Sequence, residues 1–186
     1  LTASAWAEVV LEVDFNDGAL EPMLAANYGD GDVTAEVVAG VGVDGTPCAR
    51  IVNERPEARG AVKYDMRYKV GHAYTITCMA RAEEGTAEVL AYLDSGDWRL
   101  KYGGGYSPAV EVGEDWQEIT WTNVHKQGRS YLANVRNNSQ APLLVDNVVI
   151  RESEGQVAIN HALADNGGTP LADSLYSQYR LEALND

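Results

Sequence analysis

The chain has 186 residues and a formal charge of −14, from 28 acidic and 14 basic side chains. Nucleic-acid binding depends on Lys and Arg neutralising phosphates, so this charge argues against a nucleic-acid partner. The 18 Gly and 10 Tyr, a single Phe and short apolar runs favour a β-sandwich over a helical bundle. No run approaches the roughly 18 apolar residues that would indicate a membrane span.

Short segments in which apolar and polar residues alternate recur along the chain, at intervals of about ten residues. In chain order, the predicted strands are 8–15, 33–39, 48–53, 61–67, 73–82, 87–93, 98–102, 116–124, 131–137 and 143–151. Turn residues such as Asp44-Gly45 and Glu84-Gly85 separate them. Strands in this number without alternating helices predict an all-β fold of two antiparallel sheets packed face to face. The one helix-like stretch, 171–185, lies near the C-terminus.

Four segments resemble, in the same order, the strands of carbohydrate-binding modules of the family 4, 9, 16 and 22 type. They are 13–18 (VDFNDG), 71–81 (GHAYTITCMAR), 116–121 (WQEITW) and 144–150 (LVDNVVI). The resemblance implies a β-jelly-roll sandwich over residues 1–155 that binds polysaccharide without catalysing a reaction. It also makes Trp116 a core residue, because its family counterpart is a packing residue.

The C-terminal extension has a resemblance of its own. Segments 160–169 (NHALADNGGT), 174–179 (SLYSQY) and 183–186 (ALND) are similar to the start of a discoidin-type module. Residues 156–186 are therefore interpreted as a linker and the truncated start of a second module. This implies a multimodular, secreted parent protein whose signal peptide is absent from this chain.

The carbohydrate-binding-module resemblance also implies a structural calcium ion. The matching positions are Asn16 or its neighbour Asp17, the turn at Asp44, and Asp146, and Ca²⁺ takes oxygen ligands of this kind. Asn16 stands where the family usually has Glu, which lowers the ligand charge, and Asp14 can compensate. The alternative is that the Asp17 and Asp44 side chains stabilise turns and that Asp146 ends a strand.

Sugar binding needs aromatic rings for the apolar face of a pyranose and planar polar groups for its hydroxyls. The richest segment, 94–106, contains Trp98, Arg99, Tyr102 and Tyr106. A second group is Tyr64 with Arg67, and a third contains Trp121. Strand parity leaves open that Trp98 and Tyr102 face the core, and it favours the core for Trp121.

No catalytic motif stands out. The acidic pairs Glu83-Glu84 and Glu114-Asp115 lie in predicted turns, where solvated charge is the ordinary reading, and the chain lacks a Gly-x-Ser-x-Gly or His-Glu-x-x-His motif. We therefore expect a monomeric, noncatalytic module that keeps an attached polysaccharide-degrading enzyme near its substrate, a β-glucan or xylan. The alternative is a structural spacer domain. Cys48 and Cys78 can be two buried thiols or one disulfide.

Overall fold

The computed structural model describes residues 7–93, 105–125 and 130–154. The predicted strand 98–102 and the C-terminal extension with its helix-like stretch lie outside these residues. Within them, no helix is long and apolar enough to cross a membrane.

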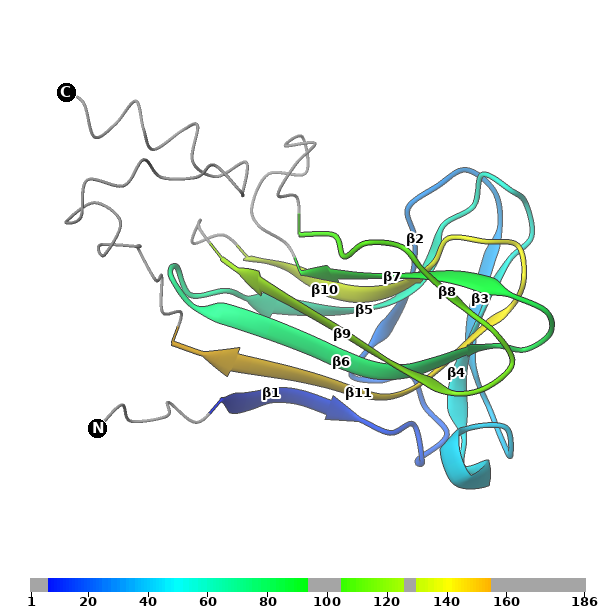
Figure 1. Cartoon of the computed structure of the whole chain (residues 1–186), viewed down its shortest axis with the longest axis horizontal. Helices are drawn as coiled ribbons and strands as arrows, with labels where there is room; N and C mark the ends of the chain where they lie inside the picture. The colour runs from blue at the N-terminus through cyan, green and yellow to red at the C-terminus, as the bar shows by residue number, and fades with distance from the viewer. Residues whose placement is uncertain (1–6, 94–104, 126–129, 155–186) are drawn as a thin grey trace, which may run out of the picture.

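Two antiparallel sheets pack face to face (Figure 1). Sheet A contains, in spatial order, β3 (Val33–Val38), β4 (Cys48–Asn53), β11 (Leu143–Ser153), β6 (Ala73–Ala82) and β9 (Gln117–Val124), and β1 (Glu8–Val13) also pairs with β11. Sheet B contains β2 (Leu24–Asn27), β5 (Gly60–Arg67), β10 (Ser130–Asn137), β7 (Ala87–Leu93) and β8 (Val110–Val112). A 3₁₀ turn, η1 (Val43–Gly45), precedes β4. The predicted all-β, two-sheet sandwich is confirmed.

The predicted strands coincide closely with the observed ones. β4, β6 and β7 have the predicted bounds, and six others differ by one or two residues at an end. Two strands were not predicted. β2 is only 4 residues long and β8 only 3, too short for apolar and polar residues to show a clear alternation.

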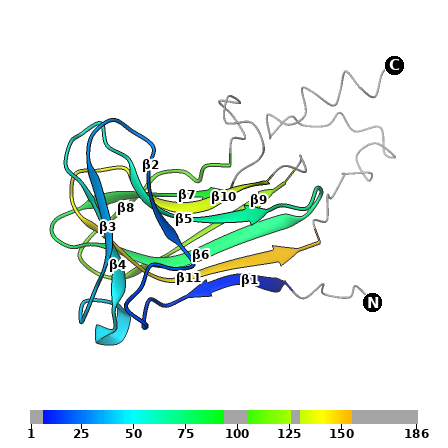
Figure 2. The same ribbon diagram turned by 180° about the vertical axis from the view of Figure 1, so that it is seen from behind.

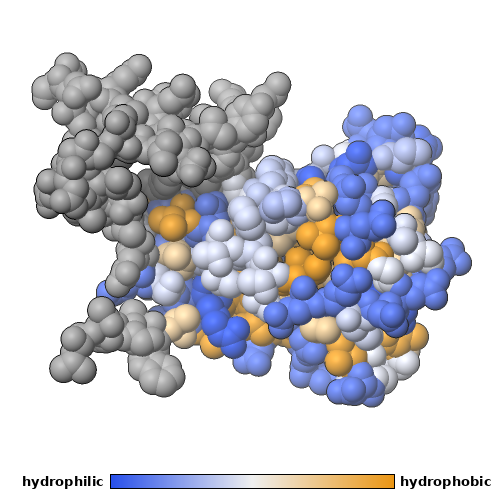
Figure 3. Space-filling view, in the orientation of Figure 1, coloured by the Kyte–Doolittle hydropathy of each residue, from blue (hydrophilic) through white to orange (hydrophobic). Residues whose placement is uncertain are grey.

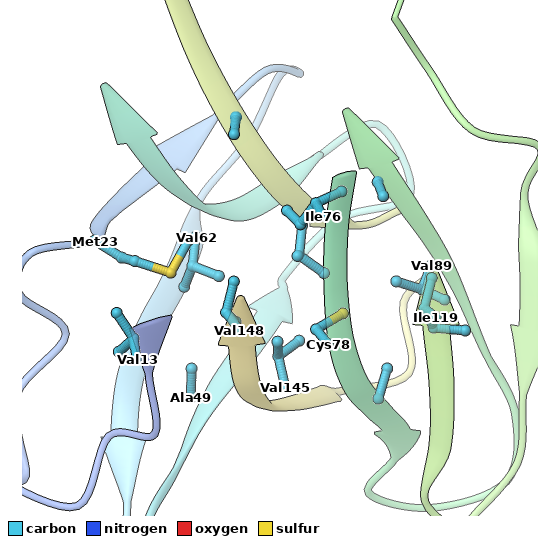
Figure 4. Packing of buried hydrophobic residues seen from close by; sticks show 14 of the residues in the cluster. Val13, Met23, Ala49, Val62, Ile76, Cys78, Val89, Ile119, Val145 and Val148 are labelled. Carbon is cyan, nitrogen blue, oxygen red and sulfur yellow. The ribbon is translucent and has the colours of Figure 1, made fainter. Parts of the chain in front are cut away.

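The core lies between the sheets, and it is formed by the apolar residues that alternate with polar ones along the strands. Along β6, every second residue from Tyr74 to Ala82 is buried, while the residues between them are only partly buried. Figure 4 shows Met23 and Val62 pointing toward side chains of the opposite sheet, such as Val148. Alternate burial of this kind fixes which side chains of every strand face outward.

β11 is the longest strand, and it changes one of its neighbours halfway along. Its first residues pair with β4, and its last residues pair with β1. The register shifts between Asp146 and Val149, and Asn147 there has a left-handed φ of 49°. The start of β1 and the end of β11 therefore lie at the same end of the sandwich, as Figure 2 shows from behind.

A pair of buried asparagines joins the sheets near the opposite end. Asn53 of β4 donates to the carbonyls of Asn137 (3.0 Å) and Ser139 (2.7 Å), and its Oδ1 accepts from Gly60 N–H (2.7 Å). Asn137 of β10 donates in turn to the carbonyl of Ile51 (3.1 Å). These bonds satisfy buried polar groups on strands of both sheets.

The other end of the sandwich is joined by aromatic and ionised groups. Tyr68 lies edge-on to Tyr74, with ring centroids 4.7 Å apart, and donates to the carbonyl of Leu132 in sheet B (3.1 Å). Tyr74 of sheet A donates to Glu152 (3.0 Å), which also pairs with Lys69 (2.5 Å). Both ends of the sandwich are thus closed by side chains with defined partners.

Candidate functional site

The outer face of sheet B carries a row of polar and aromatic side chains. Strand register places Lys63 opposite Asn134, Asn134 opposite Tyr92, and Tyr92 opposite Tyr106. The neighbouring residue Val135 of β10 is buried in the core, so Asn134 points to the other side of the sheet. Because adjacent strands are about 4.8 Å apart, the four positions form a continuous band across the sheet.

Aromatic rings gather at this band. Tyr106, 43% exposed, lies against the buried Tyr92 with ring centroids 4.4 Å apart at 46°. The guanidinium carbon of Arg136 lies 5.0 Å from the centre of the Tyr106 ring, within cation–π range. Tyr28, which follows β2, is 41% exposed and hydrogen-bonds with the side chain of Asn134. We call these five residues the tyrosine–arginine face.

The tyrosine–arginine face also perturbs a titratable group. The pKa of the Tyr28 phenol is raised, chiefly by burial, and the charges of Asp65 and Tyr106 raise it further. The hydrogen bond to Asn134 and the positive charge of Arg136 act in the opposite direction. The phenol of Tyr28, the amide of Asn134 and the guanidinium of Arg136 are thus close enough to influence one another.

Two buried polar atoms on this face have no hydrogen-bond partner: Oδ1 of Asn134, a residue only 3% exposed, and Nε of Arg136. The only other such side-chain atom in the described residues is Nδ1 of His72, 2.9 Å from Glu152 Oε1, where a proton on the ring nitrogen would complete the bond. Buried polar groups are normally paired, so these two unpaired atoms make the outer face of sheet B a candidate site for the polar groups of a ligand.

The charged groups of the face are unevenly paired. Lys63 forms an ion pair with Asp65 at 3.0 Å. Arg136 and the exposed Arg67 have no ion-pair partner among the described residues. Arg67 lies opposite Ser130, whereas Arg136 lies opposite Ala61, so the two arginines are at different ends of the paired strands.

The predicted sugar-binding residues are distributed over three places. Tyr106 is in the tyrosine–arginine face, and Arg67 lies on the same side of sheet B. Tyr64 has the inward parity of β5 and packs against the core. Trp121 also packs against the core and donates its indole N–H to the carbonyl of Gly105 (2.9 Å). Trp98, Arg99 and Tyr102 lie outside the described residues.

Trp121 also borders a hollow of about 430 Å³ between the edge strands β8 and β9. Its lining is mainly apolar and includes Pro108, Val110 and Ile119. Figure 3 shows hydrophobic surface over this part of the molecule. The hollow is a second place where a ring-shaped ligand can lie, but it contains none of the unpaired polar atoms described above.

Trp116, expected in the core, is half-buried at the start of β9, and the guanidinium carbon of Arg81 lies 5.3 Å from its ring centre. The two cysteines are buried free thiols, in β4 and β6 on either side of β11. Burial raises the pKa of both thiols to about 12. The reading as buried thiols holds, and neither thiol is reactive at neutral pH.

Three of the four predicted calcium ligands lie in turns. Asn16 donates its side-chain amide to Asp14 (2.8 Å), and Asp17 accepts from the backbone N–H of Ala19 (3.0 Å). Asp44 is exposed, with a left-handed φ of 56°. Within the described residues, no three His, Cys, Asp or Glu side chains are grouped so that they could hold a metal ion.

Asp146 differs from these three because its carboxylate is buried. Burial raises its pKa, and the negative charge of Asp14 raises it further. Other oxygens are near: a Cβ atom on Gly42 would lie 2.6 Å from the carbonyl of Thr46 and 2.8 Å from both Asp146 Oδ2 and the carbonyl of Pro47. These are oxygen types that calcium binds. The calcium ion itself stays a prediction.

Sequence reasoning missed Tyr28, Asn134 and Arg136. The parity of β10 carried a usable signal, because Ala133 and Val135 alternate with Asn134 and Arg136 and so mark which side is outward. Tyr28 directly follows β2 and donates its backbone N–H to the carbonyl of Arg59 (3.0 Å), but β2 is too short for the sequence to show a pattern there.

Solved structures resemble this sandwich. The CBM22-1 xylan-binding domain of Paenibacillus barcinonensis Xyn10C superposes with a TM-score of 0.61 at 17% identity, over 82% of this chain and 99% of that one. The chain has the fold of a carbohydrate-binding module.

Two further structures share this jelly roll. The CBM22-1 and GH10 modules of Clostridium thermocellum xylanase 10B, complexed with xylohexaose, match with a TM-score of 0.56 at 17% identity, over 82% of this chain and 30% of that one. TmCBM61, complexed with β-1,4-galactotriose, matches with a TM-score of 0.50 at 14% identity, over 74% and 92%. The sequence itself matches no protein-family profile and no curated protein.

Proposed function

We propose that this protein is a noncatalytic carbohydrate-binding module that binds a β-linked polysaccharide of the xylan or β-glucan type on the tyrosine–arginine face. The observation that carries the proposal is the pair of unpaired buried polar atoms, Asn134 Oδ1 and Arg136 Nε, beside the exposed rings of Tyr28 and Tyr106. Rings contact the apolar face of a pyranose, and the two polar atoms hydrogen-bond its hydroxyls.

The similar folds support this choice of ligand class. Of the proteins with a similar fold, one is a xylan-binding domain and two are complexed with xylohexaose and with β-1,4-galactotriose. The charge of −14 agrees with a largely neutral polymer, since a polyanion would be repelled. In this proposal the module is secreted and linked to a polysaccharide-degrading enzyme, whose effective concentration at an insoluble substrate it raises.

Affinity electrophoresis and calorimetry with xylan, mixed-linkage β-glucan and β-1,4-galactan test the proposal. Tyr28→Ala combined with Tyr106→Ala should abolish binding of the glycan that the wild-type protein retains, because stacking on both rings is lost. The matched control is Thr75→Ala combined with Thr122→Ala, a hydrogen-bonded pair of side chains on the outer face of sheet A. It should bind as the wild type does.

The same experiment distinguishes the alternatives. Binding that survives the tyrosine variant but is lost in Trp121→Ala would move the site to the hollow between β8 and β9. Loss in Trp98→Ala alone would move it to the segment 94–104. No binding to any of the glycans would reject the proposal in favour of a spacer domain, and release of reducing ends would indicate an enzyme.

We also propose a calcium ion beside Gly42, with Asp146 and Asp14 as its carboxylate ligands and the carbonyls of Thr46 and Pro47 as further oxygens. The buried Asp146 carboxylate supports this, because a bound cation would compensate its charge. Bound there, the ion would stabilise the junction between η1 and the bulge of β11.

A further inference from the structure

The cations on the outer face of sheet B differ in how they are compensated. Lys63 is neutralised by Asp65 at 3.0 Å, whereas the exposed Arg67 has no ion-pair partner among the described residues. Arg136 is the cation within the tyrosine–arginine face, and it has no acidic partner among the described residues. The half-buried Arg59 and Arg81 also lack an ion pair among the described residues, but both donate to backbone carbonyls, whereas Nε of Arg136 has no partner.

The guanidinium of Arg136 is held by rings instead of by an anion. It lies over Tyr106, with 5.0 Å from its central carbon to the ring centre, and its charge acts on the phenol of Tyr28. Stacking on an aromatic face orients a guanidinium without pairing its N–H donors, and the buried Nε of Arg136 is indeed unpaired. A planar fork of donors matches a carboxylate, which can accept two parallel hydrogen bonds.

We propose, on the basis of the proposed function above, that the glycan bound by this face carries a carboxylate, and that Arg136 contacts it. The ligand is thus a neutral β-linked chain that bears isolated uronic acid residues. The overall charge of −14 selects isolated acidic groups over a polyuronate or a sulfated polymer. Repulsion from distant charges is screened beyond about 8 Å at physiological salt, whereas one carboxylate in contact with Arg136 is not.

Matched ligands test this inference on the wild-type protein. We would measure, by calorimetry, the affinity for a xylo-oligosaccharide with one glucuronic acid branch, for the same compound with its carboxyl reduced to an alcohol, and for the unbranched chain. A charge-assisted contact should favour the acidic compound by about tenfold. That preference should shrink in 1 M salt, where the screening length falls to about 3 Å.

Variants then assign the preference to a residue. Arg136→Gln keeps a planar hydrogen-bond donor without the charge, and it should bind the acidic and reduced compounds equally. Arg136→Lys keeps the charge without the fork, and it should retain only part of the preference. The control is Arg151→Gln, an exposed arginine of β11 in sheet A, which should retain all of it. Unchanged melting temperatures would establish that each variant is folded.

The outcomes separate the two proposals. Equal wild-type affinity for the acidic and reduced compounds would overturn the carboxylate inference and leave the proposed function standing. So would an Arg136→Gln variant that weakens both compounds by the same factor, since Arg136 would then contact hydroxyls. Tighter binding of a polygalacturonate or a sulfated glycan than of the branched compound would reject isolated uronates. No binding of any of these glycans would overturn both proposals.

Discussion

Two asparagines of this sandwich are buried to the same degree but differ in their hydrogen bonding. Asn53, between the sheets, is 4% exposed and uses its amide N–H groups and its Oδ1 in bonds of 2.7 to 3.0 Å. Asn134, on the outer face of sheet B, is 3% exposed, and its Oδ1 has no partner. Folding alone satisfies the first side chain and leaves the Oδ1 of the second unpaired, and the proposed binding site rests on this difference.

The same contrast holds for arginines on the two outer faces. On sheet A, Arg50 is bonded to Glu83 through Nε and an Nη atom (2.6 to 3.0 Å), and Arg81 donates to the carbonyl of Val41 (3.2 Å). On sheet B, Arg136 has an aromatic neighbour, no ion-pair partner among the described residues, and an unpaired Nε. The arginines of sheet A therefore have partners within the fold, whereas Arg136 of sheet B has a donor that the proposal assigns to a ligand.

The largest effect that we predict comes from removing the fully bonded asparagine. Asn53→Ala leaves Gly60 N–H and the carbonyls of Asn137 and Ser139 without partners inside the fold. We expect the free energy of unfolding, measured by urea denaturation, to fall by about 3 kcal/mol, because each unsatisfied buried group costs about 1 kcal/mol or more. A loss below about 1 kcal/mol would mean that the hydrogen bonds of Asn53 do not set the joint between the sheets apart from the outer face of sheet B.

The fold was largely predictable from the sequence because burial imposes a period of two on strands such as β6, although β7 is buried almost throughout. In strand 73–82, for example, the apolar residues Tyr74, Ile76 and Cys78 indicate which side faces the core. Trp116 was placed in the core by the family resemblance, but the buried Ile119 shows that odd-numbered positions of β9 face inward, and the half-buried Trp116 lies against Arg81 instead.

The site was less predictable, because it depends on register between strands that are far apart in the sequence. Asn134 of β10 meets Tyr92 of β7 and Lys63 of β5 only once the sheet is assembled. Counting aromatic residues found Tyr106 but also selected Tyr64, whose parity turns it toward the core. Unpaired polar atoms, the observation that decides the site, exist only in three dimensions.

Asp146 is a second buried polar group that the fold leaves incompletely paired. Its carboxylate accepts backbone hydrogen bonds but has no cation beside it among the described residues. If calcium binds there, a free concentration one hundred times its dissociation constant stabilises the fold by about 2.7 kcal/mol. Thermal melting with calcium and with chelator measures this increment. Asp146→Asn should remove it, and the control Asp17→Asn, whose side chain is bonded to Ala19 N–H, should retain it.

The pH dependence of the metal-free protein follows from the raised pKa of Asp146. Since the folded pKa lies above the unfolded one, folding binds the proton more tightly, and this carboxyl favours unfolding above its folded pKa. The metal-free wild type should therefore gain stability relative to Asp146→Asn as the pH falls through that pKa. The calcium increment should shrink over the same range. Identical melting with calcium and with chelator at neutral pH would reject the calcium site.

The smallest effect on stability is expected at the incomplete asparagine, which is where the comparison is sharpest. Asn134→Ala removes a side chain as buried as Asn53, but it breaks only the bond to Tyr28, a residue that is 41% exposed and can bond to water. We expect the free energy of unfolding to fall by no more than about 1 kcal/mol. Glycan affinity should fall about tenfold, because the unpaired Oδ1 acquires its partner only in the complex. Asn53→Ala, measured at a temperature at which it is still folded, should show the opposite pattern: a large loss of stability and little loss of glycan affinity. The contrary outcome is an Asn134→Ala protein that is strongly destabilised but binds glycan normally. Asn134 would then stabilise the fold as Asn53 does, and the outer face of sheet B would no longer differ from the joint between the sheets.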